Sequence, residues 1–210
     1  LYTHLVFNLN YLRDDLAENS KLSRLIGKQY VEKIIKPKLT NFANIKPKNS
    51  KSGQLRIGIL SSNFARHSVG WCSADIIQEL SKLTPHLYLY STSKRQPDER
   101  TKLFEEASAK FYRLTKLQDS TADAQEILDQ IIQDQLDILI ALDSLTVPLQ
   151  VQILHQKPAP VCLYWLGFEA PFTSEENYFL CDEHTHPSGT EQYYREQLIH
   201  PPDSFVAVAG

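Results

Sequence analysis

The chain has 210 residues, of which 42% are apolar and 22% charged, and its formal net charge is −3. The length suits one full domain with a smaller appendage, or two small domains, and the composition is that of an ordinary globular protein. No window approaches 18 uninterrupted apolar residues and no secretory signal pattern is visible, so we expect no contact with a membrane. Because the sequence contains no methionine, we interpret it as a piece of a longer polypeptide.

Cysteine usage indicates the redox environment. Cys72, Cys162 and Cys181 are an odd number of cysteines without close pairing. This pattern is typical of free thiols in a reducing compartment, and we therefore expect a cytoplasmic protein. Cys72 falls on the apolar face of a predicted helix, which favours a buried, inert thiol over a nucleophile.

Charge is distributed unevenly along the chain. Residues 1–53 hold ten Lys or Arg against four Asp or Glu, whereas the remainder is acidic. The basic cluster from Lys36 to Lys51 alternates with Pro and Asn, which favours a solvated linker over a nucleic-acid footprint on folded structure. We therefore expect a basic linker over residues 36–53 and no nucleic-acid partner.

Residues 1–35 are predicted to form two helices, because apolar residues recur there at near-helical spacing. Asn19 and Ser20 precede the second apolar stripe and can cap a helix with their side-chain oxygens. The two predicted stripes are Leu5, Leu9, Leu12 and Leu16, followed by Leu22, Leu25, Ile26, Ile34 and Ile35. Two helices cannot bury both stripes alone, so we expect them to pack on chain outside this sequence or on the following domain. With the linker they make an expected lead-in domain, residues 1–53.

From residue 54 to 210, short apolar runs alternate with amphipathic segments, which predicts βαβ units. The expected strands are 54–60, 86–90, 111–114, 136–142, 160–165, 178–180 and 197–200, and the expected helices are 68–83, 98–110, 120–133 and 148–155. The near-continuous apolar run at 136–142 is typical of a strand buried on both sides of a parallel sheet. The predicted fold class is therefore α/β, a Rossmann-like and mostly parallel sheet preceded by a short helical segment.

The loop after the first predicted strand carries the first candidate for chemistry. Right-handed crossovers bring all strand-end loops to one edge of such a sheet, where α/β proteins bind their ligands. His67 lies in this loop, directly before Ser68 and an expected helix. The positive end of a helix disfavours imidazolium, so a neutral ring could act as a general base or bind a hydroxyl. The alternative is a histidine that only caps the helix or fills the loop.

Cys181, His184 and His186, with His200 nearby, are residue types that zinc prefers. Their spacing fits no closed structural zinc site and no metalloprotease helix, so we expect a polar loop and no metal. A Gly-rich phosphate cradle is also missing after the first strand. This disfavours a flavodoxin-like small-molecule domain, and it predicts that any nucleotide pyrophosphate is held elsewhere.

Two stretches of the sequence are more specific than these patterns. Residues 55–67 match L-R-I/V-G-Y-V-S-x-D-F-x-x-H, with Asn63 in place of the acid, and residues 157–167 are close to R/K-P-A-P-x-Q-x-x-W-L-G-Y. Both motifs resemble the catalytic region of the protein O-GlcNAc transferases and their SPINDLY-like relatives. Residues 135–140 resemble the family's G-I-D-I-L-V strand, and residues 7–11 resemble the segment that leaves its tetratricopeptide repeats.

The resemblance implies the first lobe of a two-lobed glycosyltransferase of the GT-B type, whose C-terminal lobe is missing from this sequence. Family members transfer a sugar, usually N-acetylglucosamine from UDP-N-acetylglucosamine, to Ser or Thr of a protein acceptor, with inversion and without a metal or other cofactor. His67 matches the family histidine that acts as base or contacts the reacting groups. The substrate-binding residues expected from the resemblance are Ser68, Asp143, Thr146, Gly167 and Glu169.

Three expected cleft loops depart from the family pattern. The family's G-Y/H-T reads Asp143-Ser-Leu-Thr146, which keeps Thr146 but loses the glycine and the aromatic residue or histidine, and its small residues after W-L-G-Y are replaced by Glu169–Ser174. A family His-Phe/Trp pair appears as Lys110-Phe111. Either the sugar or the acceptor differs, or the lobe no longer catalyses. The alternative function is then a degenerate, non-catalytic lobe that serves as a protein-binding module.

Overall fold

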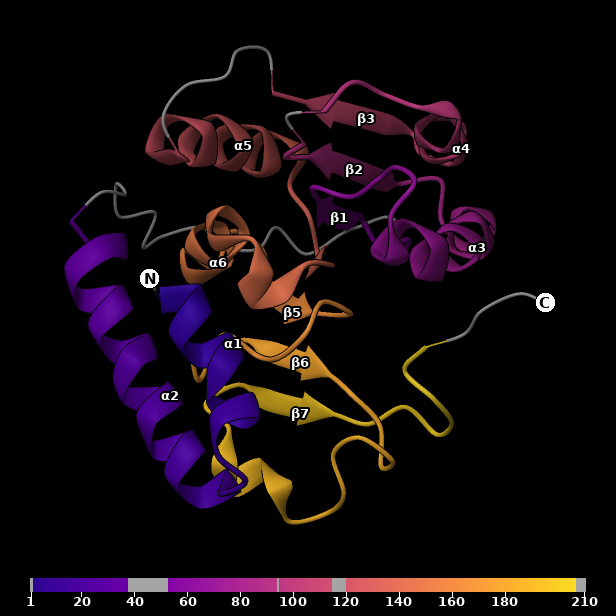
Figure 1. Cartoon of the computed structure of the whole chain (residues 1–210). Helices are drawn as coiled ribbons and strands as arrows, with labels where there is room; N and C mark the ends of the chain where they lie inside the picture. The colour runs from indigo at the N-terminus through magenta and orange to yellow at the C-terminus, as the bar shows by residue number, and fades with distance from the viewer. Residues whose placement is uncertain (1, 38–52, 94, 115–119, 207–210) are drawn as a thin grey trace.

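The computed structural model describes residues 2–37, 53–93, 95–114 and 120–206. They form a seven-stranded sheet in the order β3-β2-β1-β4-β5-β6-β7 (Figure 1). Every neighbouring pair of strands is parallel. The predicted fold class, a Rossmann-like α/β sheet preceded by helices, is confirmed.

The strands and helices lie close to the positions that the hydrophobic pattern predicts. The strands are β1 (Ile57–Ser61), β2 (Leu87–Ser91), β3 (Lys110–Arg113), β4 (Ile138–Ala141), β5 (Val161–Tyr164), β6 (Tyr178–Leu180) and β7 (Gln197–Ile199). The α-helices are α1 (Tyr2–Leu12), α2 (Leu16–Tyr30), α3 (Ser68–Leu83), α4 (Glu99–Ala107), α5 (Ser120–Asp134) and α6 (Pro148–His155). A π-helical turn η1 (Val31–Ile35) continues α2, and the short 3-10 turns are η2 (Ser144–Thr146) and η3 (Thr190–Tyr193).

Local side chains explain where several helices begin. The His67 ring caps α3 by accepting from the backbone N–H of Val69. Asp98 opens α4 in a capping box with Thr101, and Pro148 stands in the first turn of α6, where its missing N–H costs nothing.

Helices cover both faces of the sheet (Figure 1). Helices α3 and α4 pack on one face, over a core that includes Phe64, Ile77 and Phe104. Helices α5 and α6 pack on the other face, where the core includes Leu128 and Tyr164, together with residues of α1 and α2. The chain changes face between β3 and β4, so β1 and β4 lie side by side with their crossovers on opposite faces. Such a switch point is the usual ligand site of doubly wound sheets.

The two leading helices pack on the β5–β7 half of this fold, one of the two arrangements that we expected. The hydroxyl of Tyr2 donates to the carbonyl of Pro171, and Ser20 Oγ donates to the carbonyl of Tyr193. Gly27 lies so close to the carbonyl of Phe172 that a Cβ would overlap its oxygen. Figure 1 shows α1 and α2 lying beside β6 and β7.

The prediction of which face of these helices is buried was wrong. Most of the predicted apolar stripe is exposed, namely Leu5, Leu12, Leu16, Leu22, Leu25 and Ile34. The buried face instead carries aromatic, small and polar residues, namely Tyr2, Val6, Asn19, Ser20, Ser23, Gly27 and Tyr30. Small side chains allow backbones to approach closely, so contact with the β5–β7 loops decided the face and hydrophobicity did not.

Most of the expected basic linker, residues 38–52, lies outside the described residues. Of its cations, Lys36 is described and pairs with Glu32 at 2.7 Å. Among the residues that the structure describes, no helix is both long and apolar enough to cross a membrane.

Candidate active site at the ends of strands β1 and β4

The loops that follow β1 and β4 are joined by the buried carboxylate of Asp143. Its Oδ2 accepts from Ser61 Oγ at 3.0 Å, from the backbone N–H of Ser62 at 2.7 Å and from Gln150 Nε2. Its Oδ1 accepts from Asn63 Nδ2. Asn63 stands where the family motif has an acid, and an acid there would place two carboxylates in contact. The polar network therefore fixes the two loops of the switch point relative to each other.

His67 lies at the end of the β1 loop and is partly exposed. Its Nδ1 accepts from the backbone N–H of Val69 at 3.2 Å, and Ser68 Oγ lies 3.5 Å from the same nitrogen. Because Nδ1 is an acceptor in this arrangement, a neutral ring carries its proton on Nε2. The histidine thus presents an N–H donor beyond the end of β1. The ring therefore caps α3, as one of the two alternatives held, while its Nε2 remains unpartnered by described protein groups and a chemical role for it stays a prediction.

Trp71 follows His67 by one helical turn and was not singled out by the sequence reasoning. Its indole is 50% exposed, and the Arg100 guanidinium carbon lies 3.8 Å from the ring centroid. Residues four apart share a helix face, which places this flat aromatic surface on the same side of α3 as His67. The four-residue spacing between His67 and Trp71 could have identified Trp71 from the sequence.

Thr146 and Gly167 are both exposed, in the loops after β4 and β5. Thr146 Oγ1 donates to the carbonyl of Asp143, which holds its hydroxyl beside the switch point. Gly167 has φ +71°, and a Cβ there would lie 2.8 Å from the Asp143 backbone and from Ser144 Cβ. Glycine is therefore required by the backbone conformation and by the close approach of the two loops. Ser144 has φ +46°, the left-handed region that suits the family's glycine at this position.

Glu169 is mostly buried and faces the leading helices. Its Oε1 accepts from the backbone N–H of Ala170 at 2.9 Å, and its Oε2 accepts from the Tyr194 hydroxyl at 3.3 Å. His186 Nε2 lies 4.0 Å from the same carboxylate. The hydroxyl of Ser144 donates to the Glu169 carbonyl. Asp143 and Glu169, the two carboxylates expected at the site, are thus both engaged by neighbouring protein groups.

Glu196 is another residue that the sequence reasoning missed. Its side chain forms hydrogen bonds with the backbone of the loop of residues 171–174. This buried carboxylate accepts from the backbone N–H groups of Phe172, Thr173 and Ser174 at 2.8–3.2 Å. Burial raises the pKa of Glu196 to about 7, although these hydrogen bonds act in the opposite direction. An acidic residue directly before a short strand gave no periodic signal by which it could have been recognised.

The polar residues considered for zinc lie in the turn after β6. The Asp182 carboxylate accepts from the backbone N–H groups of His184 and Thr185, and His186 packs edge-on against Phe179. His200 Nε2 donates to the carbonyl of His186. Within the described part of the chain, no group of three or more His, Cys, Asp or Glu residues could hold a metal ion.

The three cysteines are free thiols. Cys162 and Cys181 are buried, and burial raises the pKa of each to about 12, which keeps them protonated and inert. Cys72 is only partly buried, so the expectation of a buried thiol at that position was wrong. Its side chain packs against the core under α3 but is not fully covered there.

Comparison with known proteins connects this geometry to a family. The model of glycosyl transferase family 41 matches residues 17–208. The probable UDP-N-acetylglucosamine–peptide N-acetylglucosaminyltransferase SEC of Arabidopsis thaliana is 25% identical over 154 residues, which are 72% of this chain and 15% of that protein. The UDP-N-acetylglucosamine–peptide N-acetylglucosaminyltransferase of Caenorhabditis elegans is 29% identical over 160 residues, which are 74% of this chain and 13% of that protein.

The fold has a counterpart of known structure. An O-GlcNAc transferase mutant of Thermobaculum terrenum matches 98% of this chain with a TM-score of 0.79 and 21% sequence identity, and the match covers 38% of that chain. This chain therefore spans only a small part of the length of its relatives. Because the family model extends over nearly all of the sequence, the chain belongs to glycosyl transferase family 41.

Proposed function

We propose that this chain is the first lobe of an inverting glycosyltransferase that moves a sugar from a UDP-sugar to Ser or Thr of a protein. The names of the relatives from Arabidopsis thaliana and Caenorhabditis elegans favour UDP-N-acetylglucosamine as the donor. A second lobe of the same polypeptide supplies most of the nucleotide contacts, and neither metal nor cofactor is needed. The location is cytoplasmic in this proposal.

The observation that carries the proposal is the placement of His67 beyond the end of β1, at the switch point of the sheet. Its Nε2–H is free to donate to an oxygen of the reacting groups, while Nδ1 stays bound to the backbone of α3. In this conformation the ring orients an oxygen and does not take up the proton of the acceptor hydroxyl. Proton transfer to Nε2 would require the ring to release the N–H of Val69.

The remaining expected residues take different parts in this proposal. The exposed hydroxyls of Ser68 and Thr146 and the backbone at Gly167 line the sugar site. Asp143 and Glu169 shape that site by holding its loops, since their oxygens are already occupied. Trp71 offers a flat surface on which a sugar or a peptide can stack.

The test compares two substitutions of His67 in the full polypeptide with both lobes. Asn is a strong N-cap, so His67→Asn removes the imidazole and keeps α3 capped, whereas His67→Ala removes both. We expect both variants to lose at least about 100-fold in kcat for sugar transfer. Only His67→Ala should also lose about 1 kcal/mol of unfolding free energy. Radiolabelled sugar transfer and urea denaturation measure the two effects.

His86→Asn is the matched control, because His86 lies directly before β2, at the amino-terminal end of the strands, whereas His67 lies beyond their carboxyl ends. Its turnover should equal that of the unmodified protein. Full turnover in His67→Asn would remove the histidine from the mechanism.

One observation favours the alternative, a non-catalytic lobe that binds proteins. The loop after β5, which departs from the family pattern, packs against the leading helices: the rings of Phe168 and Phe7 lie tilted with centroids 4.2 Å apart, and Phe172 is buried against Gly27. Bulky residues that pack against the helices thus stand where the family has small residues that would admit a sugar. If the unmodified full polypeptide transfers no sugar from any UDP-sugar while it still captures acceptor-type proteins, the alternative is correct.

A further inference from the structure

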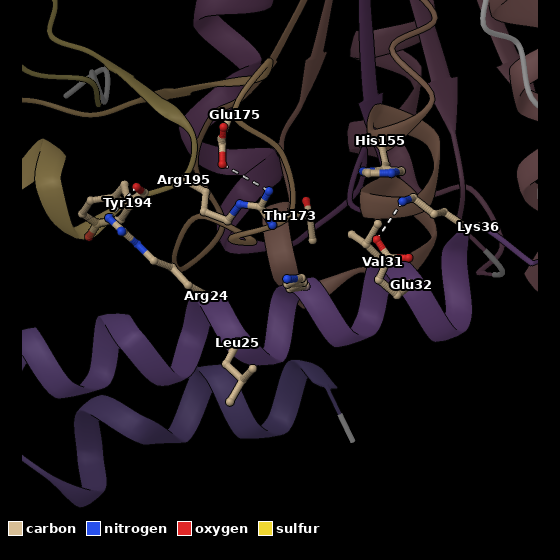
Figure 2. Close-up of a pocket in the computed structure, with 11 residues that line it drawn as sticks. Arg24, Leu25, Val31, Glu32, Lys36, His155, Thr173, Glu175, Tyr194 and Arg195 are labelled. Atoms are coloured by element: carbon tan, nitrogen blue, oxygen red, sulfur yellow. Dashed lines mark hydrogen bonds and ion pairs between the residues drawn. The ribbon is translucent and has the colours of Figure 1, made fainter.

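A large cavity among the described residues lies away from His67. It has a volume of about 580 Å³, within the range of small-molecule sites, and opens between α2, the π-helical turn η1 and the amino-terminal ends of β5–β7 (Figure 2). The candidate active site instead lies at the carboxyl ends of β1 and β4. The two sites are therefore separate, and a ligand bound in this cavity is independent of the proposed function.

Positive charge dominates this cavity, although the chain as a whole has a net charge of −3. Four cationic residues line it, namely Arg24, Lys28, Lys36 and Arg195, against the two acids Glu32 and Glu175. Glu32 is paired with Lys36 at 2.7 Å. Glu175 is 76% exposed and lies 3.4 Å from Arg195, which is long for a charge-assisted hydrogen bond. Arg24 and Lys28 make no ion pair within 4.0 Å among the described residues, although the charge of Lys28 also acts on Glu32, so the cations that line the cavity outnumber its acids by two.

Two buried side-chain nitrogens in the cavity also lack hydrogen-bond partners among the described residues. The η2 nitrogen of Arg24 donates to the carbonyls of Gln192 and Tyr194, but its Nε is buried without a hydrogen bond. The Nδ1 of His155 is likewise buried and unpartnered among the described residues. Burial, followed by the charges of Lys36 and Arg195, lowers the pKa of His155. Buried polar atoms without partners are rare in native proteins, and a bound water, ion or ligand is one way in which they are satisfied.

Part of the cavity wall is formed by the π-helical turn η1, which has an uncommon backbone conformation. In η1 the backbone N–H of Lys36 donates to the carbonyl of Val31 at 3.0 Å, the i→i+5 pattern of a π-helix. Such turns are rare and occur frequently at functional sites. Leu25, Val31 and Tyr194 are among the residues that line the cavity and add apolar atoms to its wall.

We propose that this cavity binds a small organic diphosphate, whose phosphate oxygens are contacted by Arg24, Lys28 and Arg195. Guanidinium groups match the geometry of phosphate oxygens and bind them through two parallel N–H groups. A ligand with two phosphates neutralises the excess charge, and its organic part covers the apolar wall. The volume exceeds what a diphosphate alone would fill.

The experiment titrates the purified protein with inorganic pyrophosphate and, separately, with ADP, by calorimetry at about 50 mM salt, where charge–charge attraction is weakly screened. We expect one site, with ADP binding more tightly than pyrophosphate because of the apolar wall. Lys28→Gln should weaken binding several-fold, and the double variant Lys28→Gln with Arg195→Gln should weaken it at least tenfold. Equal affinity for pyrophosphate and ADP would mean that only the phosphate groups are recognised, and it would overturn the proposal that the apolar wall binds an organic group.

Lys82→Gln is the matched control, since Lys82 lies on α3 and pairs with Glu79 on the opposite face of the sheet. It should bind both probes like the unmodified protein. Lys28 is exposed and makes no side-chain hydrogen bond within the described part of the chain, so its substitution leaves the fold intact, which a thermal melt without ligand confirms. Absence of binding to the unmodified protein, or an equal loss in Lys82→Gln, would overturn the proposal.

Discussion

Each half of the sheet contains a buried carboxylate that accepts several hydrogen bonds from loop groups, but the two carboxylates have different structural effects. At β1 and β4, Asp143 joins two loops and leaves the His67 ring partly exposed beside them. At β5–β7, Glu196 draws the loop 172–174 inward, where it packs under α2. The first half retains the family motif that ends at His67, whereas the second keeps W-L-G at residues 165–167 but has lost the small residues that follow it. We infer from this contrast that a drifted cleft loop became part of the packing of the leading helices.

Helix docking explains why the second half could drift. Phe168 stacks on Tyr11 of α1 and packs at a tilt against Phe7, and Phe172 stacks on Tyr194. These contacts require bulk where the family has small residues. Helix α1 also contacts the turn η2 after β4, but no described aromatic residue of α1 or α2 stacks on the β1 loop, and His67 stays partly exposed there.

The largest effect is expected at the first carboxylate. Asp143→Ala should lower the free energy of unfolding by about 3 to 4 kcal/mol, because it leaves several buried donors of the β1 loop and Gln150 without an acceptor. Urea denaturation measures the change as a lower midpoint at an unchanged m-value.

Asp143→Asn is the matched variant, because it keeps the shape and one acceptor oxygen, and it should lose less than half as much. If Asp143→Ala is as stable as the unmodified protein, the network does not hold the switch point together.

The second carboxylate should make stability depend on pH. The pKa of Glu196 is raised to about 7 in the fold from its ordinary value of 4.5, so folding favours the protonated form. This contribution is complete below about pH 4.5 and is lost as the pH rises through 7, with a magnitude of up to about 3 kcal/mol. Chemical denaturation at pH 4.5, 6 and 8 measures it.

The glutamine in Glu196→Gln cannot ionise, so the variant should lack this pH dependence of the free energy of unfolding. Its stability relative to the unmodified protein should therefore rise between pH 4.5 and 8. Parallel pH profiles for the two proteins would show that Glu196 does not titrate in this range.

The smallest effect tests the docking of α2 itself. Alanine is favoured over glycine inside a helix by about 1 kcal/mol. Gly27→Ala should nevertheless destabilise the protein by about 1 to 3 kcal/mol, because the added Cβ would overlap the carbonyl of Phe172. Thermal and urea unfolding measure the change. Gln29→Ala, on the exposed face of the same helix, should be neutral within about 0.5 kcal/mol. A Gly27→Ala protein more stable than the unmodified one would mean that α2 does not press on this loop.

Much of this protein was determined by its sequence alone. The alternation of apolar runs with amphipathic segments predicted every strand of the described sheet, because hydrophobic period is a local property that survives in any tertiary context. The position of His67 between a strand and a helix likewise predicted its place at the carboxyl ends of the strands, and the motif around it indicated the family.

Tertiary structure alone decided the rest. The leucines of α1 and α2 had the helical period but stayed exposed, because Ser20, Ser23 and Gly27 allow a closer approach to the β5–β7 loops. Asp143, read from the sequence as a carboxylate for the substrate, became the acceptor that joins two loops 80 residues apart in the chain. Hydrogen-bond partners and close approaches between distant segments leave no period in the sequence, since they depend on which surfaces the fold brings into contact.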